Sequence, residues 1–285
     1  MKICYVCENE SFTLRPGSVR DNSKLDILEC TNCGLVFLSE HTHIKETHYE
    51  NSGMHGGEVI SETEWLKENE KDDERRFRFL KSKLLNKRLL DFGCGVGGFL
   101  LKSKSITNQS EGVELELRLQ PYYSKFDLKV WKNLDEVLES KQAYDIITAF
   151  HVIEHLKDPI TVIRSLIQLL NPNGELIIEV PSSNDALLTL YKSDEFSHFT
   201  YWSQHLFLFN NETFKRLIQK SKLRLNWLKQ IQRYPLSNHL YWLSKGQPGG
   251  HNVWSFLDNE TIGREYESQL ASIGLCDTII ASVSV

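Results

Sequence analysis

The sequence predicts an α/β fold in which a mostly parallel sheet is covered by helices on both faces, preceded by a small cysteine-containing module. From residue 88 onward, short apolar segments typical of buried strands alternate with amphipathic segments typical of helices. Such alternation indicates right-handed βαβ crossovers and a parallel sheet. Before residue 40, two pairs of cysteines lie in a short stretch punctuated by glycine and proline.

The composition excludes several classes of protein. Of the 285 residues, 40% are apolar and 25% are charged, which is typical of a globular protein. The formal net charge of −5 disfavours nucleic-acid binding, which needs clustered Lys and Arg. The short basic run at 75–78 follows three acidic residues, so we interpret it as the solvated face of a helix. The sequence shows neither a membrane-spanning segment nor a secretory signal, and we expect a cytoplasmic protein.

The four N-terminal cysteines have the spacing of a metal site. Cys4 and Cys7 form one CxxC pair, and Cys30 and Cys33 form the second. Each pair can place two thiolates on one turn, and two such turns complete a tetrahedral site for Zn²⁺. Four protein ligands leave no open coordination position, so we expect a structural ion. A redox dithiol or two disulfides are the alternatives, although a redox site typically uses one CxxC beside a helix.

The remaining elements follow from hydrophobic periodicity. A loop is expected at 41–60, and a charged, helix-prone segment follows it. Strand patterns lie at 88–92, up to 112–114, at 128–131, 144–150, 176–180 and 277–283. Helix patterns occupy 62–84, 99–104, the stretch that begins at Asp158-Pro159, and the stretch capped by Asn210.

A glycine-rich turn joins the strand at 88–92 to its helix. Gly93, Gly95 and Gly98 satisfy the G-x-G-x-x-G pattern, whose missing side chains let the backbone approach a ligand closely. Glu114, at the end of the next strand, can accept hydrogen bonds from both hydroxyls of a ribose. A nicotinamide-dependent oxidoreductase and a methyltransferase would both show this arrangement.

Longer motifs distinguish these two. The segment LLDFGCGVGGFL at 89–100 resembles the first motif of class I S-adenosylmethionine-dependent methyltransferases, and Gly112-Val113-Glu114 resembles their ribose-binding acid. Residues 145–159 are similar to their fourth strand and the turn beyond it. The resemblance runs from about residue 85 to 220. It implies a Rossmann-like class I sheet whose last strand is antiparallel.

The resemblance also implies a division of the chain into domains. Residues 1–40 form a zinc-ribbon-like module, 41–84 a linker and N-terminal helices, and 85–285 the methyltransferase domain. Within that domain, residues 233–276 are an insertion between the sixth and seventh strands.

The resemblance further implies contacts with S-adenosylmethionine. Asp91 and the backbone at Gly93 would serve the methionine part, and Glu114 would bind the ribose. Cys94 is expected to act sterically and not as a nucleophile. The other expected contacts are Gly95 and Gly97 in the loop, Leu115, Asn133 and Leu134 around the adenine, and Phe150 and His151 beside the sulfonium.

Methyl transfer to oxygen or carbon also needs a group that takes a proton, and histidine has a suitable pKa. We rank His198 first, His155 second and His205 third. Two of the three lie in an aromatic segment, 196–205, that is expected to cover the acceptor pocket. Residues 151–155 also match the H-x-x-E-H motif of zinc proteases, but Asp158-Pro159 stops the long helix which that motif requires.

A double CxxC joined to this core resembles the zinc-containing C-methyltransferases that act on nucleotide-linked deoxyketosugars. In that group the segment after the fifth strand reads aromatic-Glu-His-aromatic, whereas Ser197 replaces the acid here. We therefore expect a methyl group to be transferred to carbon or oxygen of a small polar acceptor, such as a sugar or a nucleotide-sugar or surface-glycan precursor. The alternatives are an NAD(P)-dependent oxidoreductase and a non-catalytic zinc-ribbon adaptor.

Overall fold

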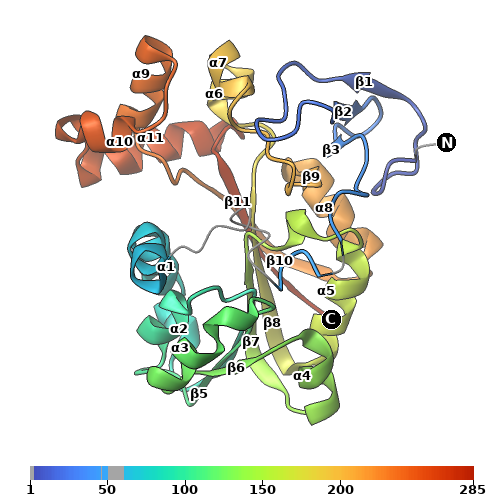
Figure 1. Cartoon of the computed structure of the whole chain (residues 1–285), viewed down its shortest axis with the longest axis vertical. Helices are drawn as coiled ribbons and strands as arrows, with labels where there is room; N and C mark the ends of the chain where they lie inside the picture. Colours follow the sequence, from blue (N-terminus) through green and yellow to red (C-terminus); the bar gives the residue numbers. More distant parts are fainter. Residues whose placement is uncertain (1–2, 46, 51–60) are drawn as a thin grey trace. The chain divides into compact units, whose positions relative to one another are not determined.

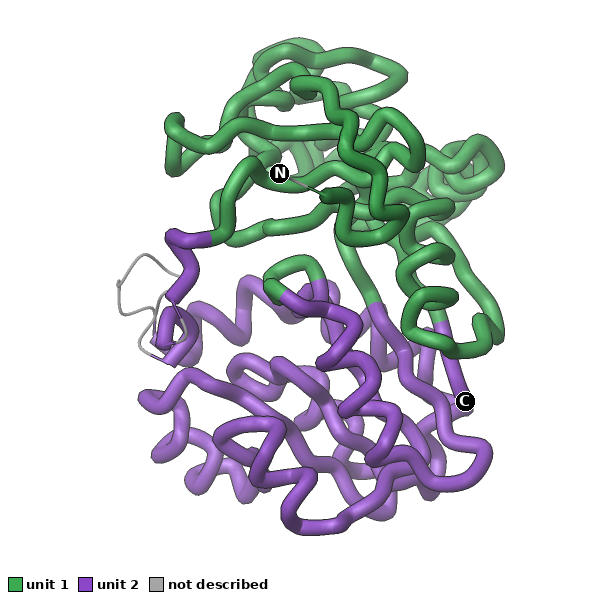
Figure 2. The backbone as a smooth tube through the Cα atoms, turned by 90° about the vertical axis from the view of Figure 1, so that its right-hand side faces the viewer, with its two compact units in different colours: residues 1–41, 154–157, 179–281 green, residues 42–153, 158–178, 282–285 purple. Residues whose placement is uncertain are grey.

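The chain folds into two compact units. The computed structural model describes residues 3–45, 47–50 and 61–285, so the loop expected at 41–60 lies partly outside the described residues. Unit 1 combines residues 1–41, 154–157 and 179–281, and unit 2 combines 42–153, 158–178 and 282–285 (Figure 2). The domain boundaries drawn from the sequence at 40 and 84 divide the chain in a different way and stay a prediction.

The main sheet has seven strands in the order β10-β11-β8-β7-β4-β5-β6 (Figure 1). It is mostly parallel with one antiparallel strand, which confirms the predicted fold class. The strand order reverses beside β4, where ligands bind in open α/β sheets. The strands are β4 (Arg88–Phe92), β5 (Gln109–Val113), β6 (Lys129–Trp131), β7 (Tyr144–Phe150), β8 (Leu170–Pro181), β10 (Arg224–Ile231) and β11 (Thr278–Ser284).

In unit 2, the parallel pairing of β4 fixes the register of the site. Asp91 lies opposite Gly112 on β5 and opposite Thr148 on β7. Leu89 and Leu90 are completely buried, as expected for a strand covered on both faces. The helical segments that begin in this unit are α1 (Glu62–Leu84), α2 (Gly98–Ser103), η2 (Leu117–Leu119), α3 (Gln120–Lys125), α4 (Leu134–Ser140), η3 (Ile153–His155) and α5 (Pro159–Gln168).

Local capping explains where two of these helices begin. Ser61 and Glu64 form a reciprocal capping box, so α1 spans the residues that periodicity predicts. Asp158 caps α5, and Pro159 occupies its first position. One predicted boundary is wrong. β8 begins at Leu170, six residues before the predicted strand, and the Asn173-Gly174 pair, in which Asn173 is left-handed (φ 65°), lies within the strand and not before it.

Unit 1 contains a second, four-stranded antiparallel sheet. Its strands are β1 (Phe12–Leu14), β2 (Ile27–Cys30), β3 (Val36–Leu38) and β9 (Phe207–Leu208), in that order. The pairing of β3 with β9 ties the cysteine module to a segment that is distant in sequence. The other helical segments of unit 1 are α6 (Ala186–Thr189), α7 (Asp194–Ser197), α8 (Asn211–Lys220), α9 (Leu236–Lys245), α10 (Gly250–Val253), η4 (Ser255–Leu257) and α11 (Glu260–Ser272).

The last four of these segments lie between β10 and β11, so the region at 233–276 is helical. Within the described residues, no helix combines the length and the apolar character needed to cross a bilayer.

Candidate cofactor and acceptor sites

The glycine loop between β4 and α2 takes a backbone conformation that other residues adopt only with strain. Gly93, Gly95 and Gly97 have φ values of 75°, 51° and 74°. At Gly93, an added Cβ would also lie 2.4 Å from a methyl carbon of Val152. Both the torsion and the close approach therefore require glycine at this position.

Two side chains hold the loop in place. The backbone N–H of Gly95 donates to Glu114 Oε2 at 2.9 Å, and the buried Tyr123 hydroxyl donates to the Gly95 carbonyl at 2.6 Å. Glu114 Oε1 accepts from the N–H of Glu116 at 3.0 Å. The predicted ribose acid thus faces the glycine loop with its carboxylate already oriented.

Cys94 packs against the neighbouring strand. A Cβ at Gly112 would lie 2.5 Å from the Cys94 sulfur, so the thiol occupies the space that this glycine leaves. Burial, with the nearby charges of Glu114 and Asp91, raises the pKa of the Cys94 thiol well above its ordinary value. The group is therefore a poor nucleophile, as the steric interpretation expects.

Asp91 is a buried carboxyl at the end of β4. It is 3% exposed, and its Oδ1 accepts a hydrogen bond from Thr148 Oγ1 at 2.7 Å. Burial raises the pKa of Asp91 to about 7, although the Thr148 hydrogen bond and the charge of Arg76 act in the opposite direction. Asp91 can therefore exchange a proton near neutral pH when a cation arrives beside it.

Sequence reasoning missed the contribution of α1. Arg76, which we assigned to a solvated face, is only 8% exposed, and its guanidinium stacks 4.6 Å from the centre of the Phe150 ring. It forms an ion pair with Asp73 at 3.5 Å, and a Cβ at Gly95 would contact the Trp65 ring at 3.4 Å. A guanidinium close to Asp91 could bind the carboxylate of an amino-acid group. The sequence signal for the burial of Arg76 was an acid three residues before it, at Asp73, together with the apolar Leu80 one helical turn after it.

The predicted adenine side lies on the neighbouring strand ends of the same unit. Asn133 caps α4, and its Oδ1 accepts from the N–H of Glu136 at 2.9 Å. Leu134 is the first residue of α4 and is half-buried. On the opposite side of β4, Phe150 is buried edge-to-face against Phe99 with ring centres 5.1 Å apart. All eleven predicted cofactor residues belong to unit 2, at or beyond the carboxyl ends of β4, β5, β6 and β7.

The four N-terminal cysteines come together in unit 1. Cys4 and Cys33 have sulfurs 3.6 Å apart, those of Cys7 and Cys30 are 3.5 Å apart, and all four lie within 4.8 Å of one another. None of the four is in a disulfide. Tetrahedral zinc with Zn–S bonds of about 2.3 Å would place the sulfurs roughly 3.8 Å apart. The donor set and its spacing fit a structural zinc ion.

The three histidines ranked for catalysis occupy different environments in unit 1. The His198 side chain is 52% exposed, and its Nδ1 is 2.8 Å from Ser18 Oγ. The Nδ1 of buried His155 is 2.9 Å from the Gln204 carbonyl. A carbonyl only accepts, so Nδ1 carries the proton and the lone pair of a neutral His155 lies on Nε2.

His155 has two neighbours that carry possible ligand atoms. Its ring centre is 5.0 Å from that of His205, and its Nε2 is 4.0 Å from Glu154 Oε1. The donor atoms of Glu154, His155 and His205 lie within 4.8 Å of one another. This cluster could exchange a proton or coordinate a cation.

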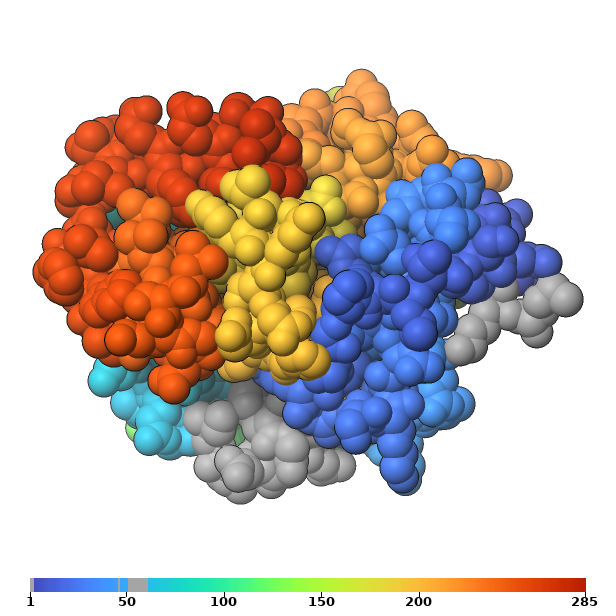
Figure 3. Space-filling model, turned by 90° about the horizontal axis from the view of Figure 1, so that it is seen from above, coloured from blue at the N-terminus to red at the C-terminus, as the bar shows by residue number. Residues whose placement is uncertain are grey.

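A cavity of about 240 Å³ lies within unit 1. Aromatic side chains form one part of its lining, namely Phe196, Phe199, Tyr201 and Trp242. Polar side chains form another part, namely Arg20, Asp185, His205, Asn238, His239 and Asp277. His205 is thus on the cavity, whereas His198 and His155 are not among its lining residues. Figure 3 shows the segment around residues 190–200, in yellow, between the N-terminal module and the C-terminal helices.

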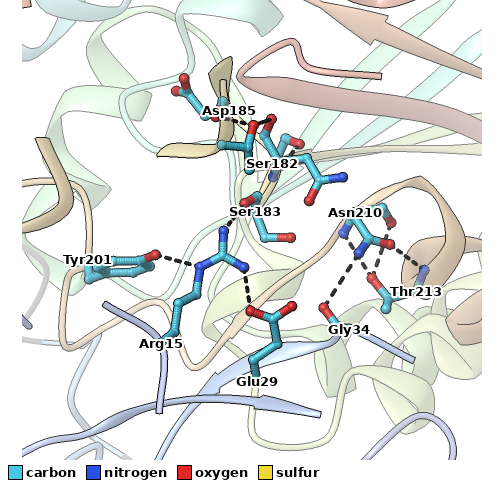
Figure 4. A network of polar contacts seen from close by, with 11 residues as sticks. Arg15, Glu29, Gly34, Ser182, Ser183, Asp185, Tyr201, Asn210 and Thr213 are labelled. Carbon is cyan, nitrogen blue, oxygen red and sulfur yellow. Dashed lines mark hydrogen bonds and ion pairs between the residues drawn. The ribbon is translucent and has the colours of Figure 1, made fainter. Parts of the chain in front are cut away.

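The N-terminal module contacts this aromatic segment through Arg15 (Figure 4). The Arg15 guanidinium donates to Tyr201 Oη at 2.8 Å, to Glu29 Oε2 at 3.0 Å and to the Ser183 carbonyl. Further along the chain, the N–H of Arg20 donates to the Tyr201 carbonyl at 2.9 Å. Periodicity contains no signal for the contacts with Tyr201 and Ser183, since more than 160 residues separate them from Arg15.

The fold and the glycine loop with its acidic neighbours define the class: a Rossmann-like, class I methyltransferase domain. A model of the methyltransferase domain family matches residues 66–226, which is more than half of the chain, and the chain belongs to this family.

Curated relatives and a solved structure show what the chain resembles. The ubiquinone biosynthesis O-methyltransferase of Vibrio vulnificus (strain YJ016) is 34% identical over 110 residues, covering 35% of this chain and 46% of the relative. The protein of the same name from Yersinia enterocolitica is 30% identical over 110 residues, with 35% and 45% covered. The chain thus spans about half the length of the curated relatives it matches.

Among solved structures, one chain of a Haloferax volcanii complex between the Trm112 methyltransferase activator and a methyltransferase is similar at a TM-score of 0.50 and 13% identity. The match covers 80% of this chain and 99% of that one. At this identity the likeness concerns the fold alone.

Proposed function

We propose that the protein is an S-adenosylmethionine-dependent methyltransferase that methylates a hydroxyl group of a small, sugar-type acceptor. One observation carries the proposal: the carboxylate of Glu114 is held by the N–H of Gly95, inside a glycine loop that starts beside the buried Asp91. Glu114 can accept hydrogen bonds from the ribose hydroxyls of a nucleoside, and Asp91 provides an anionic group for its positive charge.

The same observation disfavours a dinucleotide. A pyrophosphate binds to backbone N–H groups at the start of the helix after the glycine loop. Here the N–H of Gly95 is taken by a carboxylate, and two acids lie close to the loop. An anionic pyrophosphate would be repelled, whereas the ammonium and sulfonium of S-adenosylmethionine would be attracted.

The cofactor supplies an activated methyl group when it is bound. Glu114 would bind the ribose diol, Asp91 the methionine ammonium and Arg76 the methionine carboxylate. Leu115 and Leu134 would flank the adenine, and Phe150 and His151 would lie beside the sulfonium. The protein would contribute mainly alignment, because methyl transfer is an in-line displacement.

The cavity of unit 1 supports a sugar-type acceptor. It borders the carboxyl end of β8, where ligands of parallel sheets bind. Aromatic rings such as Trp242 and Phe196 can pack against the apolar face of a sugar ring, and Asp185 and Asn238 can bind its hydroxyls. The curated relatives are named O-methyltransferases, which favours oxygen over carbon as the atom methylated.

The cysteine module would bind one structural Zn²⁺ through Cys4, Cys7, Cys30 and Cys33. Elemental analysis of the purified protein should find about one zinc per chain. Four freely titrating thiols together with no zinc would contradict this assignment.

Two measurements test the proposed function. Calorimetric titration should show binding of S-adenosylhomocysteine and none of NADH, and the reverse result would overturn the cofactor. Incubation of the enzyme with isotopically labelled S-adenosylmethionine and a nucleotide-sugar pool should then yield a labelled sugar by mass spectrometry. Label found in no component of the pool would overturn the acceptor class but not the cofactor.

A further inference from the structure

Asp185 stands where the chain leaves the sheet. It follows the end of β8 by four residues and caps the short helix α6 by accepting the N–H of Leu187 on Oδ1 at 2.7 Å. It also lines the cavity of unit 1. The residue therefore occupies a strand end of the kind that presents functional groups in this class of fold.

Among the described residues, the second oxygen of this carboxyl has no protein partner. In the part of the chain that the structure describes, Asp185 is 7% exposed and forms no ion pair, and the N–H of Leu187 is its one hydrogen-bond donor. A carboxyl oxygen on the lining of a cavity, without a donor from the protein, can accept a hydrogen bond from a ligand there.

The other acidic group on the cavity differs in this respect. Asp277 accepts hydrogen bonds from the backbone N–H groups of Arg233 and Tyr234 and from the side chain of Gln232. Its carboxylate therefore holds the turn after β10. Of the two acids, Asp185 is the one with an oxygen available to a ligand.

His239, one of the histidines on the cavity, already has partners on both ring nitrogens. His239 Nδ1 is 2.6 Å from the Tyr266 hydroxyl, and its Nε2 is 3.1 Å from the side-chain nitrogen of Gln232. Burial lowers the pKa of His239 to about 4, so this imidazole stays neutral in the physiological range.

We infer that Asp185 binds the acceptor hydroxyl and takes its proton during methyl transfer, an inference that rests on the proposed function. The acceptor oxygen forms a bond to the methyl carbon while the carbon–sulfur bond of S-adenosylmethionine breaks. The electron pair of the broken carbon–sulfur bond stays on sulfur, which is uncharged in the product S-adenosylhomocysteine. The hydroxyl proton passes to the Asp185 carboxylate, so charge and atoms balance.

The surroundings of Asp185 suit it to this step. Burial, together with the charge of Asp277, raises the pKa of Asp185 to about 8, close to the value that makes a general base effective near neutral pH. Activity should accordingly rise with pH and level off above about 8. Four titratable groups interact electrostatically with Asp185, namely Asp277, Tyr201, Tyr266 and Cys276. The other titratable or charged groups on the cavity are Arg20, Arg233, His205, Tyr234, His239 and His251.

Two substitutions test the inference without removing the helix cap. Asp185→Asn keeps an acceptor for the N–H of Leu187 but cannot take a proton, and Asp185→Glu retains the base. With the labelled sugar as product, Asp185→Asn should lower kcat by about 100-fold or more and remove the rise near pH 8. Asp185→Glu should restore part of both, and Asp26→Asn, at an exposed acid of the same unit, should change neither.

His205→Gln is the internal comparison, because His205 lies on the same cavity. If Asp185→Asn keeps the wild-type kcat and pH profile while His205→Gln removes the rise, the inference is overturned. The affinity for S-adenosylhomocysteine should be equal in all variants.

A second readout needs no acceptor. Dicyclohexylcarbodiimide attacks protonated carboxyl groups in apolar surroundings, and at pH 7 it should modify the peptide that contains Asp185 and leave that peptide of Asp185→Asn unmodified. Absence of the adduct from the wild-type protein would overturn the inference. Because this reaction does not depend on methyl transfer, failure of the proposed acceptor class and failure of the role of Asp185 can be distinguished.

Discussion

Buried acids dominate the chemistry at the scale of single residues. Asp91 in unit 2 and Asp185 in unit 1 both have pKa values that burial raises into the neutral range, yet their partners differ. Asp91 is held by Thr148 and is influenced by Arg76, whereas the charge that acts on the pKa of Asp185 is that of another acid, Asp277. Each is placed to respond to a ligand with positive or hydrogen-donating groups.

Binding of the cofactor product should release protons from Asp91. With a pKa of about 7 in the free protein, about half of the Asp91 carboxyls are protonated at pH 7, and the ligand's ammonium would lower this pKa. The proton release should vanish above about pH 9, where Asp91 is already ionised. Calorimetric titration of S-adenosylhomocysteine in buffers of different ionisation enthalpy measures it. Equal binding enthalpies in all buffers would contradict the prediction, and Asp91→Asn provides the control.

Glu114→Gln should weaken the binding of S-adenosylhomocysteine by roughly 10- to 100-fold, because charge-assisted hydrogen bonds contribute about 1.5–3 kcal/mol. The amide also loses one of the two oxygens that accept from Gly95 and Glu116. Calorimetry measures the dissociation constant. Glu139→Gln, at an exposed acid of α4, is the matched control, and an unchanged affinity in Glu114→Gln would refute the assignment of the ribose acid.

At the scale of elements, the glycine loop and the cysteine module are both short segments whose shape is imposed by contacts outside them. The loop is shaped by Val152, Glu114 and Tyr123, which come from three different elements or their connections. The module is closed by its four sulfurs and extended by the pairing of β3 with β9.

Gly93→Ala should destabilise the protein by about 1–3 kcal/mol, because the new Cβ meets Val152 in a left-handed backbone conformation. Gly263→Ala is the opposite case. Gly263 lies inside α11 with nothing within 4 Å of an added Cβ, so alanine should stabilise the helix by about 0.5–1 kcal/mol. Urea denaturation gives both values, and a neutral Gly93→Ala would show that the loop tolerates a side chain.

Removal of the proposed zinc ion should loosen the segment at 197–203 as well as the cysteine module. Residues 15–21 run alongside it, with the N–H of Ser203 donating to Asp21 at 2.9 Å and the N–H of Arg20 donating to Tyr201 at 2.9 Å. Hydrogen exchange of both amides should accelerate after treatment with a zinc chelator. Amides of α11 serve as the internal control, and unchanged protection at 200–203 would contradict this coupling.

At the scale of the whole molecule, the chain passes from one unit to the other five times, at residues 41, 153, 157, 178 and 281. β8 and β11 each contribute residues to both units. Neither unit is therefore a continuous piece of sequence, and each depends on segments that come from distant parts of the chain.

The segment 42–178 should accordingly not fold cooperatively when it is produced alone. It lacks Ser282 and Val283, which are completely buried beside β8, and the hydrogen bond from Ser282 to Glu175 at 2.6 Å. β8 would be left with an unpaired edge. Urea titration followed by circular dichroism should show no sharp transition, whereas addition of residues 278–285 as a peptide should restore one. A sharp transition without the peptide would count against this dependence.

How far the sequence determined these conclusions depends on the range of the interactions involved. Residues 62–84, the glycine loop and Glu114 could be predicted, because periodicity, capping and strand-end acids are local signals. The pairing of β3 with β9 and the role of Arg15 could not, since their partners lie far along the chain. Arg76 was misassigned because a charged residue gives no local sign that a ring and an acid will bury it. Asp185 was overlooked because a lone acid after a strand resembles an ordinary helix cap.

The hydrogen bonds of Arg15 have a physiological consequence. If the proposed zinc ion is lost, through starvation for the metal or through oxidants that consume thiolates, the residues of the glycine loop stay intact while one wall of the proposed acceptor cavity loses its support. Binding of S-adenosylmethionine would then persist while the rate of methyl transfer falls. The availability of zinc would therefore limit the rate of methylation in the cell.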